Sequence, residues 1–380
     1  MKYTHHNGEL TLKNVGESVK LKGWVQKVRN LGGLIFIDLR DRYGITQIVC
    51  NPNHSEYQTA LRLRQEYVIE LEGVVIERES KNLHMVTGEI EVQLSSLTIL
   101  SSAETPPIMI SDDTDSLEET RLKYRYLDLR RPVMQNYMIK RHHITQSIRR
   151  TLVDLGFYEL ETPILGKSTP EGARDYLVPS RLYPGTFYAL PQSPQIYKQL
   201  FMVAGFEKYF QIARCFRDED LRADRQPEFT QVDVEASFVD EKDVQDVIES
   251  IMIALFKDVL NREIPVPFRR MTYLEAMTKY GTDKPDLRYG LEIIDLTGLF
   301  HEIHVPFFEG RSHVRGIRLS QGATLTRKQI DALTHLVKKN HGEGLATLKK
   351  QDGQVSGSII KFFTDADIEK LNLEEGDMLF

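Results

Sequence analysis

Two runs of alternating apolar residues, joined by a long charged loop, constrain the fold of this chain most strongly. The apolar positions of the two runs are Tyr209, Phe210, Ile212 and Phe216, followed by Phe229, Val232 and Val234. Alternation with a period of two is typical of β-strands, so we expect an antiparallel hairpin. On the second strand Gln231, Asp233 and Glu235 should share the face opposite Val232 and Val234.

The loop of this hairpin concentrates arginine and carboxylate side chains. Arg217 and Glu219 are two residues apart, so a first strand that continued through both would place them on one face. A charged loop is usually a solvated surface, where ion pairs contribute little to stability. Beside a sheet with one apolar and one ionic face, however, guanidinium groups and carboxylates suit a ligand that carries both phosphate and amine.

The hairpin from Phe210 to Glu235 resembles motif 2 of the class II aminoacyl-tRNA synthetases, in the form found in bacterial aspartyl-tRNA synthetases. The resemblance implies that Arg217 and Glu219 are catalytic, with Arg217 on the α-phosphate of ATP and Glu219 on the nucleotide. It also implies that Phe229 stacks on adenine. Two loop residues, Asp218 and Gln226, are expected to contact ATP.

A segment that opens a helix, Gln192–Gln199, also matches this family and implies contacts to L-aspartate. In it Ser193, Gln195 and Lys198 are expected to bind the amino acid, together with Arg217. Lys198 would pair with the side-chain carboxylate, a contact that the neutral amide of asparagine would replace poorly. Without the resemblance, a lysine at the start of a helix would be interpreted as a solvated charge.

Recognition of the substrate ammonium group is expected from two acidic residues. The segment Thr169–Tyr176 resembles a mobile loop of the family whose glutamate, here Glu171, faces the ammonium, and Gly172 would permit its movement. Asp233 is the second candidate. The alternative for Asp233 is a buried ion pair with one of the motif 2 arginines.

Residues 17–100 read as a small β-barrel. Three strand-like runs, a short helix and two more strand-like runs follow in the order expected of an OB-fold, although other small barrels would give a similar pattern. The runs are Val19–Arg29, Leu34–Arg40, Ile45–Asn51, the helix Glu56–Glu66, Val68–Glu77 and Gly88–Leu100.

The barrel is expected to bind an anticodon. Alternation alone would make Phe36 a core aromatic, but in the resembling family the matching phenylalanine stacks on an anticodon base. Trp24 is interpreted as a core residue. Amide and carboxylate side chains can read the edges of unpaired bases. The anticodon-binding residues that the resemblance implies are Arg29, Phe36, Gln47, Asn82 and Glu91.

A long helix is expected from about Met134 to Gly156, followed by the strand Phe157–Leu160. Such a helix is usually core packing. Helix, strand and then Pro163 nevertheless resemble motif 1, whose role in the family is the dimer interface. A homodimer with Pro163 at its interface is therefore implied by the resemblance.

The expected fold is a multidomain α+β protein. It comprises an OB-fold barrel in 1–103, a hinge in 104–133, a class II catalytic domain of antiparallel sheet and helices in 134–290, and a GAD-like α/β insertion in 291–380. A helix is expected at Val244–Val259, and another at Thr326–Lys339 with Thr326 as its N-cap. Motif 3 is not found, so we expect a fragment that is inactive as an isolated chain.

Composition sets further bounds. The net charge of −6 argues against indiscriminate nucleic-acid binding. Cys50 and Cys215 are the only cysteines, so neither a disulfide framework nor a cysteine zinc site is indicated. No signal peptide or membrane-spanning run is found, which favours the cytoplasm. Mg²⁺ is expected on the ATP triphosphate, but no residues read as a metal cage.

The function that the resemblance implies is an aspartate–tRNA ligase, with ATP, L-aspartate and tRNA(Asp) as partners and tRNA(Asn) as a possible further one. An asparaginyl- or lysyl-tRNA synthetase and a non-catalytic tRNA-binding protein are the alternatives. No P-loop sequence is present. The basic clusters are expected either to approach phosphates or to be solvated surfaces; they are Arg121, Lys123, Arg125, Arg130, Arg131, Arg149 and Arg150.

Overall fold

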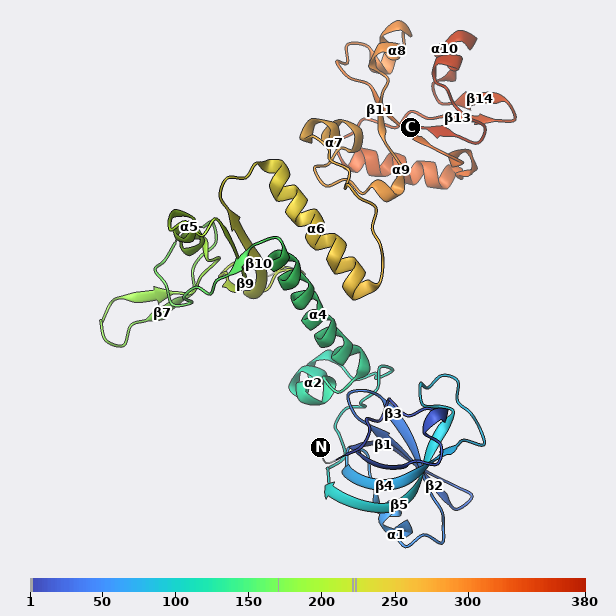
Figure 1. Cartoon of the computed structure of the whole chain (residues 1–380). Coiled ribbons are helices and arrows are strands. Elements are labelled where there is room, and N and C mark those ends of the chain that lie inside the picture. Colours follow the sequence, from blue (N-terminus) through green and yellow to red (C-terminus); the bar gives the residue numbers. More distant parts are fainter. Residues whose placement is uncertain (1–2, 170, 221, 223) are drawn as a thin grey trace. The chain divides into compact units, whose positions relative to one another are not determined.

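The computed structural model describes residues 3–169, 171–220, 222 and 224–380. The chain divides into two compact units, Met1–Ile264 and Pro265–Phe380. The first unit contains the barrel, the hinge and the motif 2 hairpin, and the second contains a further antiparallel sheet with helices (Figure 1). Among the described residues, no helix is long and apolar enough to cross a membrane.

The expected barrel is confirmed. Five strands close in the order β1-β2-β3-β5-β4, with α1 between the third and fourth strands in sequence. Helix α1 is shorter than expected because Leu63, buried in the barrel core, already adopts an extended backbone. The elements are β1 (Ser18–Leu31), β2 (Leu34–Arg40), β3 (Ile45–Cys50), α1 (Tyr57–Arg62), β4 (Val68–Glu77) and β5 (Ile90–Ser101).

Strand β2 shows how alternation builds the barrel. Ile35, Ile37 and Leu39 are fully buried in its core, so Phe36 lies on the outer face and is not a core aromatic. The interpretation of Trp24 as core is wrong. Val25 takes the inward position on β1, which leaves the indole of Trp24 outside, beneath the guanidinium group of Arg130.

The hinge comprises two short helices that precede a long one. A small apolar cluster of Ile108, Ile110 and Leu127 anchors it. The helices are α2 (Glu118–Lys123), α3 (Arg125–Asp128) and α4 (Pro132–Asp154). Helix α4 begins earlier than expected because Pro132 occupies its first position, where proline's missing N–H costs nothing.

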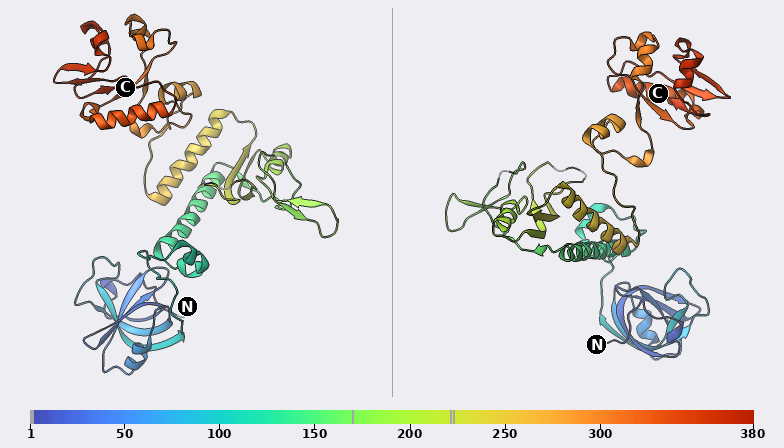
Figure 2. Two further views of the ribbon diagram at one scale, coloured as in Figure 1. Left: turned by 180° about the vertical axis from the view of Figure 1, so that it is seen from behind. Right: turned by 45° about the horizontal axis from the view of Figure 1, so that its top comes forward.

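The sheet behind the motif 2 hairpin has the order β10-β9-β6. Helices α4 and α6 pack against each other (Figure 2), and Leu152, Phe157, Phe210 and Ile251 form the core beneath them. The side chain of Asp240 caps α6, which therefore starts before the expected Val244. The elements are β6 (Tyr158–Glu159), β7 (Leu177–Pro179), β8 (Phe187–Ala189), α5 (Gln195–Val203), β9 (Lys208–Phe216), β10 (Glu228–Ala236) and α6 (Glu241–Leu260).

The second unit contains a five-stranded antiparallel sheet of order β11-β12-β15-β13-β14. Thr326 caps α9 as expected, in a capping box with Gln329. The last strand, β15, lies in the middle of this sheet. The elements are α7 (Tyr273–Tyr280), β11 (Ile293–Asp295), α8 (Thr297–Glu302), β12 (Arg315–Leu319), α9 (Arg327–Lys339), β13 (Leu348–Gln351), β14 (Gln354–Gly357), α10 (Asp365–Lys370) and β15 (Met378–Leu379).

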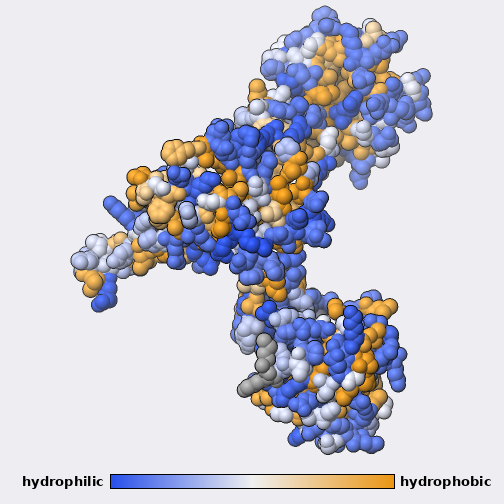
Figure 3. Space-filling model, in the orientation of Figure 1, coloured by the Kyte–Doolittle hydropathy of each residue, from blue (hydrophilic) through white to orange (hydrophobic). Residues whose placement is uncertain are grey.

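Short 3₁₀ turns complete the fold: η1 (Leu12–Asn14), η2 (Leu287–Tyr289), η3 (Pro306–Phe308), η4 (Gly322–Thr324) and η5 (Ile360–Phe362). Hydrophilic side chains cover much of the face in Figure 3, with hydrophobic patches between them. One group of exposed apolar residues lies on the N-terminal half of α4, where Tyr137, Met138 and Ile139 are each about half exposed.

Candidate functional sites

An open pocket of about 430 Å³ lies on the outer face of the barrel. Four of the five predicted anticodon-binding residues line it: Arg29, Phe36, Gln47 and Glu91. They come from β1, β2, β3 and β5, and the barrel closure brings them together. The fifth, Asn82, does not line the pocket; it lies in the 78–89 connection, where its side-chain oxygen accepts from the backbone N–H of His84.

Gln47 is the centre of the polar network in this pocket. Its Nε2 donates to Glu91 Oε2 at 2.6 Å, and its Oε1 accepts from Nη2 of both Arg29 and Arg78, at 3.1 Å each. Because both ends of the amide are engaged, its orientation is fixed. Gln47 and Glu91 are both buried, so they form a rigid floor to the pocket.

Arg29 and Arg78 each have a buried N–H donor that is not engaged by any described residue. Arg29 Nε and Arg78 Nη1 are buried and have no hydrogen-bond partner among the residues that the structure describes. Unsatisfied buried donors are costly, so a ligand that supplies acceptors here gains binding energy. Arg29 Nη2 also donates to Asp38 Oδ1 at 2.5 Å. Burial raises the pKa of Asp38 despite the nearby positive charges of Arg29, Lys27 and Arg78.

This arrangement suits an unpaired nucleobase. Phe36 offers a half-buried aromatic face, and the fixed amide and the arginine donors can address the edge of a base stacked on it. Sequence reasoning missed Asp38 and Arg78. Asp38 shares the outer face of β2 with Phe36, which was a usable signal, whereas Arg78 follows the end of β4 and only the barrel closure brings it to Gln47.

The second site lies on the ionic face of the β9–β10 hairpin, beside α5. Lys198 Nζ contacts Asp233 Oδ1 at 2.7 Å and Glu235 Oε2 at 3.3 Å. Gln231 Nε2 donates to the other oxygen of Asp233 at 2.5 Å. The expected sharing of one face by Gln231, Asp233 and Glu235 is therefore confirmed. The ion-pair partner of Asp233 is Lys198, not an arginine.

Lys198 is not a solvated charge, because its side chain is only 13% exposed. Burial by itself lowers the pKa of the ammonium group, but the hydrogen bond and charge of Asp233, with the charge of Glu235, outweigh it and raise the pKa. Two carboxylates around one ammonium give this pocket a net charge of about −1. It can therefore take a ligand that brings one ammonium group of its own and a carboxylate for Lys198.

The predicted loop glutamate lies beside the start of α5. Ser193 Oγ donates to Glu171 Oε2 at 3.0 Å, which pairs two of the predicted aspartate-binding residues. Gln192 holds the loop by donating to Ala173 O at 2.9 Å and to Asp175 Oδ1 at 2.5 Å. Burial would raise the pKa of Asp175, but the hydrogen bonds from Gln192, Ser168 and Thr169 N lower it below its ordinary value.

Arg217 lies over the ring of Phe229, with its guanidinium carbon 5.1 Å from the ring centroid. Its Nε is buried and lacks a hydrogen-bond partner within the described parts of the chain. The two residues predicted to hold the phosphate and the adenine of ATP are thus in contact across the hairpin. An anionic ligand here would satisfy the guanidinium group.

Strand β9 ends at Phe216, so it does not continue through Arg217 and Glu219, and the condition for their sharing one strand face is not met. Arg217 N donates to Pro227 O at 2.9 Å, but Pro227 has no N–H to return the bond, and the chain then turns to pair Asp218 N with Arg174 O. Glu219 instead contacts Arg225 at 3.4 Å.

The predicted roles of Asp218, Gln226 and Gln195 stay predictions; Gln195 is the first residue of α5. Within the quoted motifs, Pro170, Leu221 and Ala223 lie outside the described residues.

Cys215 lies in β9, two residues before Arg217. Burial, with the charge of Asp233, raises the pKa of its thiol to about 11. The thiol is therefore protonated near neutral pH, and a thiolate nucleophile is not available in this site.

The basic clusters of the hinge and α4 mostly hold carboxylates. Arg121, Arg125 and Arg131 surround Asp128, and Arg130 binds Glu66. On α4, Arg149 pairs with Glu159 and Arg150 with Asp258. Several of these arginines remain solvent-exposed despite their ion pairs, with Arg150 67% and Arg125 46% exposed, so both expectations for the basic clusters stay predictions. The pairs of Arg130 with Glu66 and of Arg150 with Asp258 join residues that are distant in sequence, so sequence reasoning could not find them.

Among the described residues, no group of three or more histidine, cysteine, aspartate or glutamate side chains could hold a metal ion. The residues present therefore do not fit a resident Mg²⁺ site.

Two family models match the chain. One, described as tRNA synthetases class II (D, K and N), covers residues 117–369, and the other, an OB-fold nucleic acid binding domain, covers 19–100. An aspartate–tRNA(Asp/Asn) ligase of Anoxybacillus flavithermus is 54% identical over 99% of this chain. An aspartate–tRNA ligase of Shouchella clausii is 52% identical over 100% of this chain.

The chain is shorter than these relatives. It spans 66% of the Anoxybacillus protein and 67% of the Shouchella protein. Among solved structures, the asparaginyl-tRNA synthetase of Pyrococcus horikoshii complexed with asparaginyl-adenylate superposes with a TM-score of 0.62 and 26% identity. That match covers 69% of this chain and 59% of the Pyrococcus chain.

Proposed function

Because the chain belongs to the class II tRNA synthetases of the D, K and N group, we propose that it performs the part of an aspartate–tRNA ligase that its residues can carry. The reaction activates L-aspartate with ATP to aspartyl-adenylate and then transfers the aspartyl group to tRNA(Asp). The observation that carries the proposal is Lys198, buried between Asp233 and Glu235 on the ionic face of the motif 2 hairpin.

The amino-acid pocket complements a zwitterion with a second carboxylate. The ammonium group of L-aspartate would bind Asp233 and Glu171. The side-chain carboxylate of the substrate would pair with Lys198 in place of Asp233. Asparagine would bring a neutral amide in place of that carboxylate. The ammonium of Lys198 would then lose a charge-assisted partner, which disfavours asparagine.

Adenylate formation requires the aspartate α-carboxylate to attack the α-phosphorus of ATP and expel pyrophosphate. Both reactants are anions, so catalysis here consists of alignment and charge neutralisation. Arg217 suits this role because its planar fork can bridge the phosphate and the incoming carboxylate, and its Nε is unpartnered in the described structure. Phe229 would carry the adenine, and Glu219, Asp218 and Gln226 would contact the nucleotide.

We assign the barrel pocket to the anticodon of the tRNA. Phe36 would stack on one base, and Arg29, Gln47 and Glu91 would contact base edges, with Asn82 approaching from the adjoining loop. A relative named for both tRNA(Asp) and tRNA(Asn) makes tRNA(Asn) a second candidate partner. Binding of transcripts of both tRNAs would decide between one partner and two.

A homodimer is part of the same proposal. Pro163 is exposed, and α4 of motif 1 presents the exposed apolar side chains of Tyr137, Met138 and Ile139. A second copy would cover them. We further propose the expected domain boundaries, with a hinge in 104–133 and a GAD-like module in 291–380, and a cytoplasmic location, where tRNA is charged for translation.

Calorimetric titration with a non-hydrolysable aspartyl-adenylate analogue tests the amino-acid site. We expect the aspartyl analogue to bind at least about tenfold more tightly than the asparaginyl analogue, which corresponds to about 1.4 kcal/mol. Lys198→Met should remove this preference and leave the contribution of the adenosine. Equal binding of both analogues to the unaltered chain would overturn the proposed substrate.

A further inference from the structure

Glu66 is a buried carboxylate that the proposed reaction does not use. It is only 3% exposed and lies between α1 and β4. Arg40 Nη2 donates to both of its oxygens, at 2.9 and 3.0 Å, and Arg130 Nη1 donates to Oε2 at 2.5 Å. Arg40 belongs to barrel strand β2, whereas Arg130 lies between α3 and α4. One carboxylate therefore ties the barrel to the hinge.

The position of Glu66 is fixed from several sides. Its φ of +65° is in the left-handed region, which non-glycine residues rarely adopt. The backbone holds it there, since Glu66 N donates to Val25 O at 2.7 Å and Val25 N donates to Tyr67 O at 2.8 Å. Arg130 is held as well, because its guanidinium group lies 5.4 Å from the ring centroid of Trp24.

The same β-hairpin carries this contact and the anticodon pocket. In the β1–β2 ladder Arg29 pairs with Phe36, and further along the same strands Trp24 pairs with Arg40. A displacement of one strand relative to the other would move both places together. Arg130 therefore contacts the barrel at the β1–β2 hairpin, which also carries the proposed base-stacking residue Phe36.

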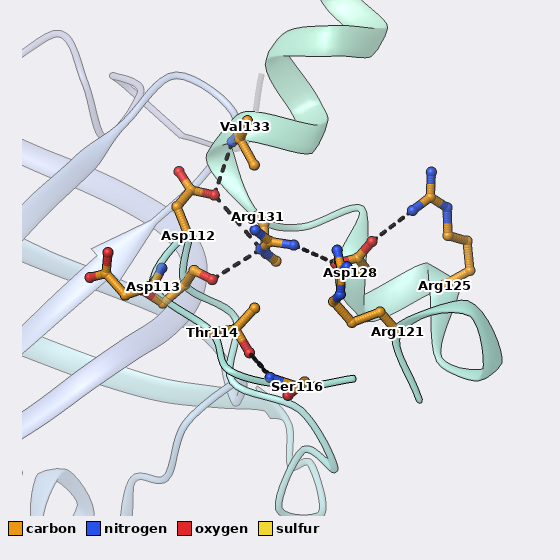
Figure 4. Close-up of polar contacts among 10 residues, drawn as sticks. Asp112, Asp113, Thr114, Ser116, Arg121, Arg125, Asp128, Arg131 and Val133 are labelled. Carbon is orange, nitrogen blue, oxygen red and sulfur yellow. Dashed lines mark hydrogen bonds and ion pairs between the residues drawn. The ribbon is translucent and has the colours of Figure 1, made fainter. Parts of the chain in front are cut away.

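On the hinge side, a second polar network centred on the neighbouring Arg131 reaches helix α4 (Figure 4). Arg131 Nη1 donates to Asp128 Oδ1 at 2.8 Å, and its Nε donates to Ser111 O at 3.0 Å. Val133 N, in the first turn of α4, donates to Asp112 Oδ1 at 3.2 Å. Asp128 is fully buried. The hinge is thus bonded to the start of the helix that leads to the motif 2 sheet.

We propose that Arg40, Glu66 and Arg130 form a rigid joint that fixes the direction of the barrel relative to α4, and that they are positioning residues for tRNA binding. The role in tRNA binding rests on the proposed function. A tRNA held at its anticodon would reach the rest of the chain as an intramolecular partner, and a rigid joint raises the effective concentration of that second contact. A loose joint would lower it without touching the anticodon pocket.

Arg130→Ala tests the joint and leaves the Arg40–Glu66 pair inside the barrel intact. Spin labels on cysteines introduced at the exposed positions Val15 and Phe238 report the distance between the barrel and the motif 2 sheet. Both native cysteines are buried, so labelling is selective for the introduced ones. We expect one narrow distance distribution for the parent chain and a broad one for Arg130→Ala. An unchanged distribution would refute the joint.

Binding of two RNAs tests the positioning role. For Arg130→Ala the dissociation constant of full-length tRNA(Asp) should rise about tenfold. Two linked contacts can strengthen binding by about 10²–10⁴-fold, so a tenfold loss corresponds to a partial loss of that effect. The dissociation constant of the isolated anticodon stem-loop should stay within about twofold, because the pocket is unchanged. Equal losses for both RNAs would contradict the proposal.

Two control variants separate a joint from a phosphate contact. Arg125→Ala removes another hinge arginine, bound to Asp128, and should leave the distance distribution unchanged. Glu66→Gln removes an anion beside Arg130, so a phosphate-binding Arg130 would bind tRNA more tightly in that variant, whereas the joint predicts weaker binding. A lower salt dependence of tRNA binding in Arg130→Ala, with unchanged distances, would also identify a phosphate contact and overturn the joint.

The proposed tRNA binding and the proposed joint can be refuted independently of each other. If the parent chain binds no tRNA, the proposed function fails, but the distance measurement still decides whether Glu66 and Arg130 form a joint. If Glu66→Gln unfolds the barrel by leaving Arg40 buried without a charged partner, Arg130→Ala remains the deciding variant.

Discussion

Replacement of Phe36 by alanine tests the anticodon pocket most sharply. Phe36 lies on the outer face of β2, beside the fixed amide of Gln47 and outside the barrel core. Its role is therefore separable from folding. A base stacked on an aromatic side chain contributes about 1–3 kcal/mol. At about 1.4 kcal/mol for each tenfold change, Phe36→Ala should raise the dissociation constant of the anticodon stem-loop about 5- to 140-fold.

Fluorescence anisotropy with a labelled stem-loop measures this change, and chemical denaturation checks the fold. The free energy of unfolding should fall by less than about 1 kcal/mol, because the side chain is only half-buried. Tyr43→Ala is a matched control: Tyr43 is a barrel aromatic, 49% exposed, that stacks on His6 away from the pocket. Stem-loop affinities of Phe36→Ala and Tyr43→Ala that both equal the parent value would refute the stacking role.

Three further predictions follow from the remaining sites. Lys198→Met should remove at least about tenfold of the preference for an aspartyl- over an asparaginyl-adenylate analogue; a preference that survives would exclude Lys198 as the selecting group. Asp128→Asn should lower the free energy of unfolding by about 1–3 kcal/mol, measured with denaturant, because buried Arg131 loses its nearer carboxylate at 2.8 Å and keeps only Asp112 at 3.7 Å; a loss under about 0.5 kcal/mol would contradict this. Burial would raise the pKa of Asp128, but Arg131, Arg121 and Arg125 hold it below its ordinary value, so its stabilisation is present above the unfolded pKa of about 3.9 and is lost as the pH falls through the lower folded value. The stability difference between the parent chain and Asp128→Asn should therefore shrink below about pH 4, and a difference independent of pH would refute the charge effect.

The sequence predicts the elements that local patterns determine. Alternation in β2 separates Ile35, Ile37 and Leu39 from Phe36, and the five strands and one helix of the barrel follow from such patterns. The resemblance corrects the prediction from the residues alone, which would place Phe36 in the core. Caps define helix ends equally well, as Thr326 does for α9.

Contacts between distant segments are not predictable in the same way. Lys198 and Asp233 are 35 residues apart, and both are expected ligand contacts, yet only the structure shows them paired with each other. Glu66 and Arg130 are 64 residues apart, and neither lies in a recognised motif. Trp24 is assigned to the core because it is large and apolar, whereas its strand position places it under the hinge. Pairings of this kind depend on barrel closure and docking.

We propose that this chain recognises tRNA(Asp) through its anticodon. The direct test compares the dissociation constants of the 380-residue chain for tRNA(Asp) and for the same tRNA with its anticodon bases replaced, at one fixed salt concentration. We expect the replacement to raise the dissociation constant at least about tenfold, since each lost base contact costs about 1–3 kcal/mol. Equal affinity for the two tRNAs would contradict it.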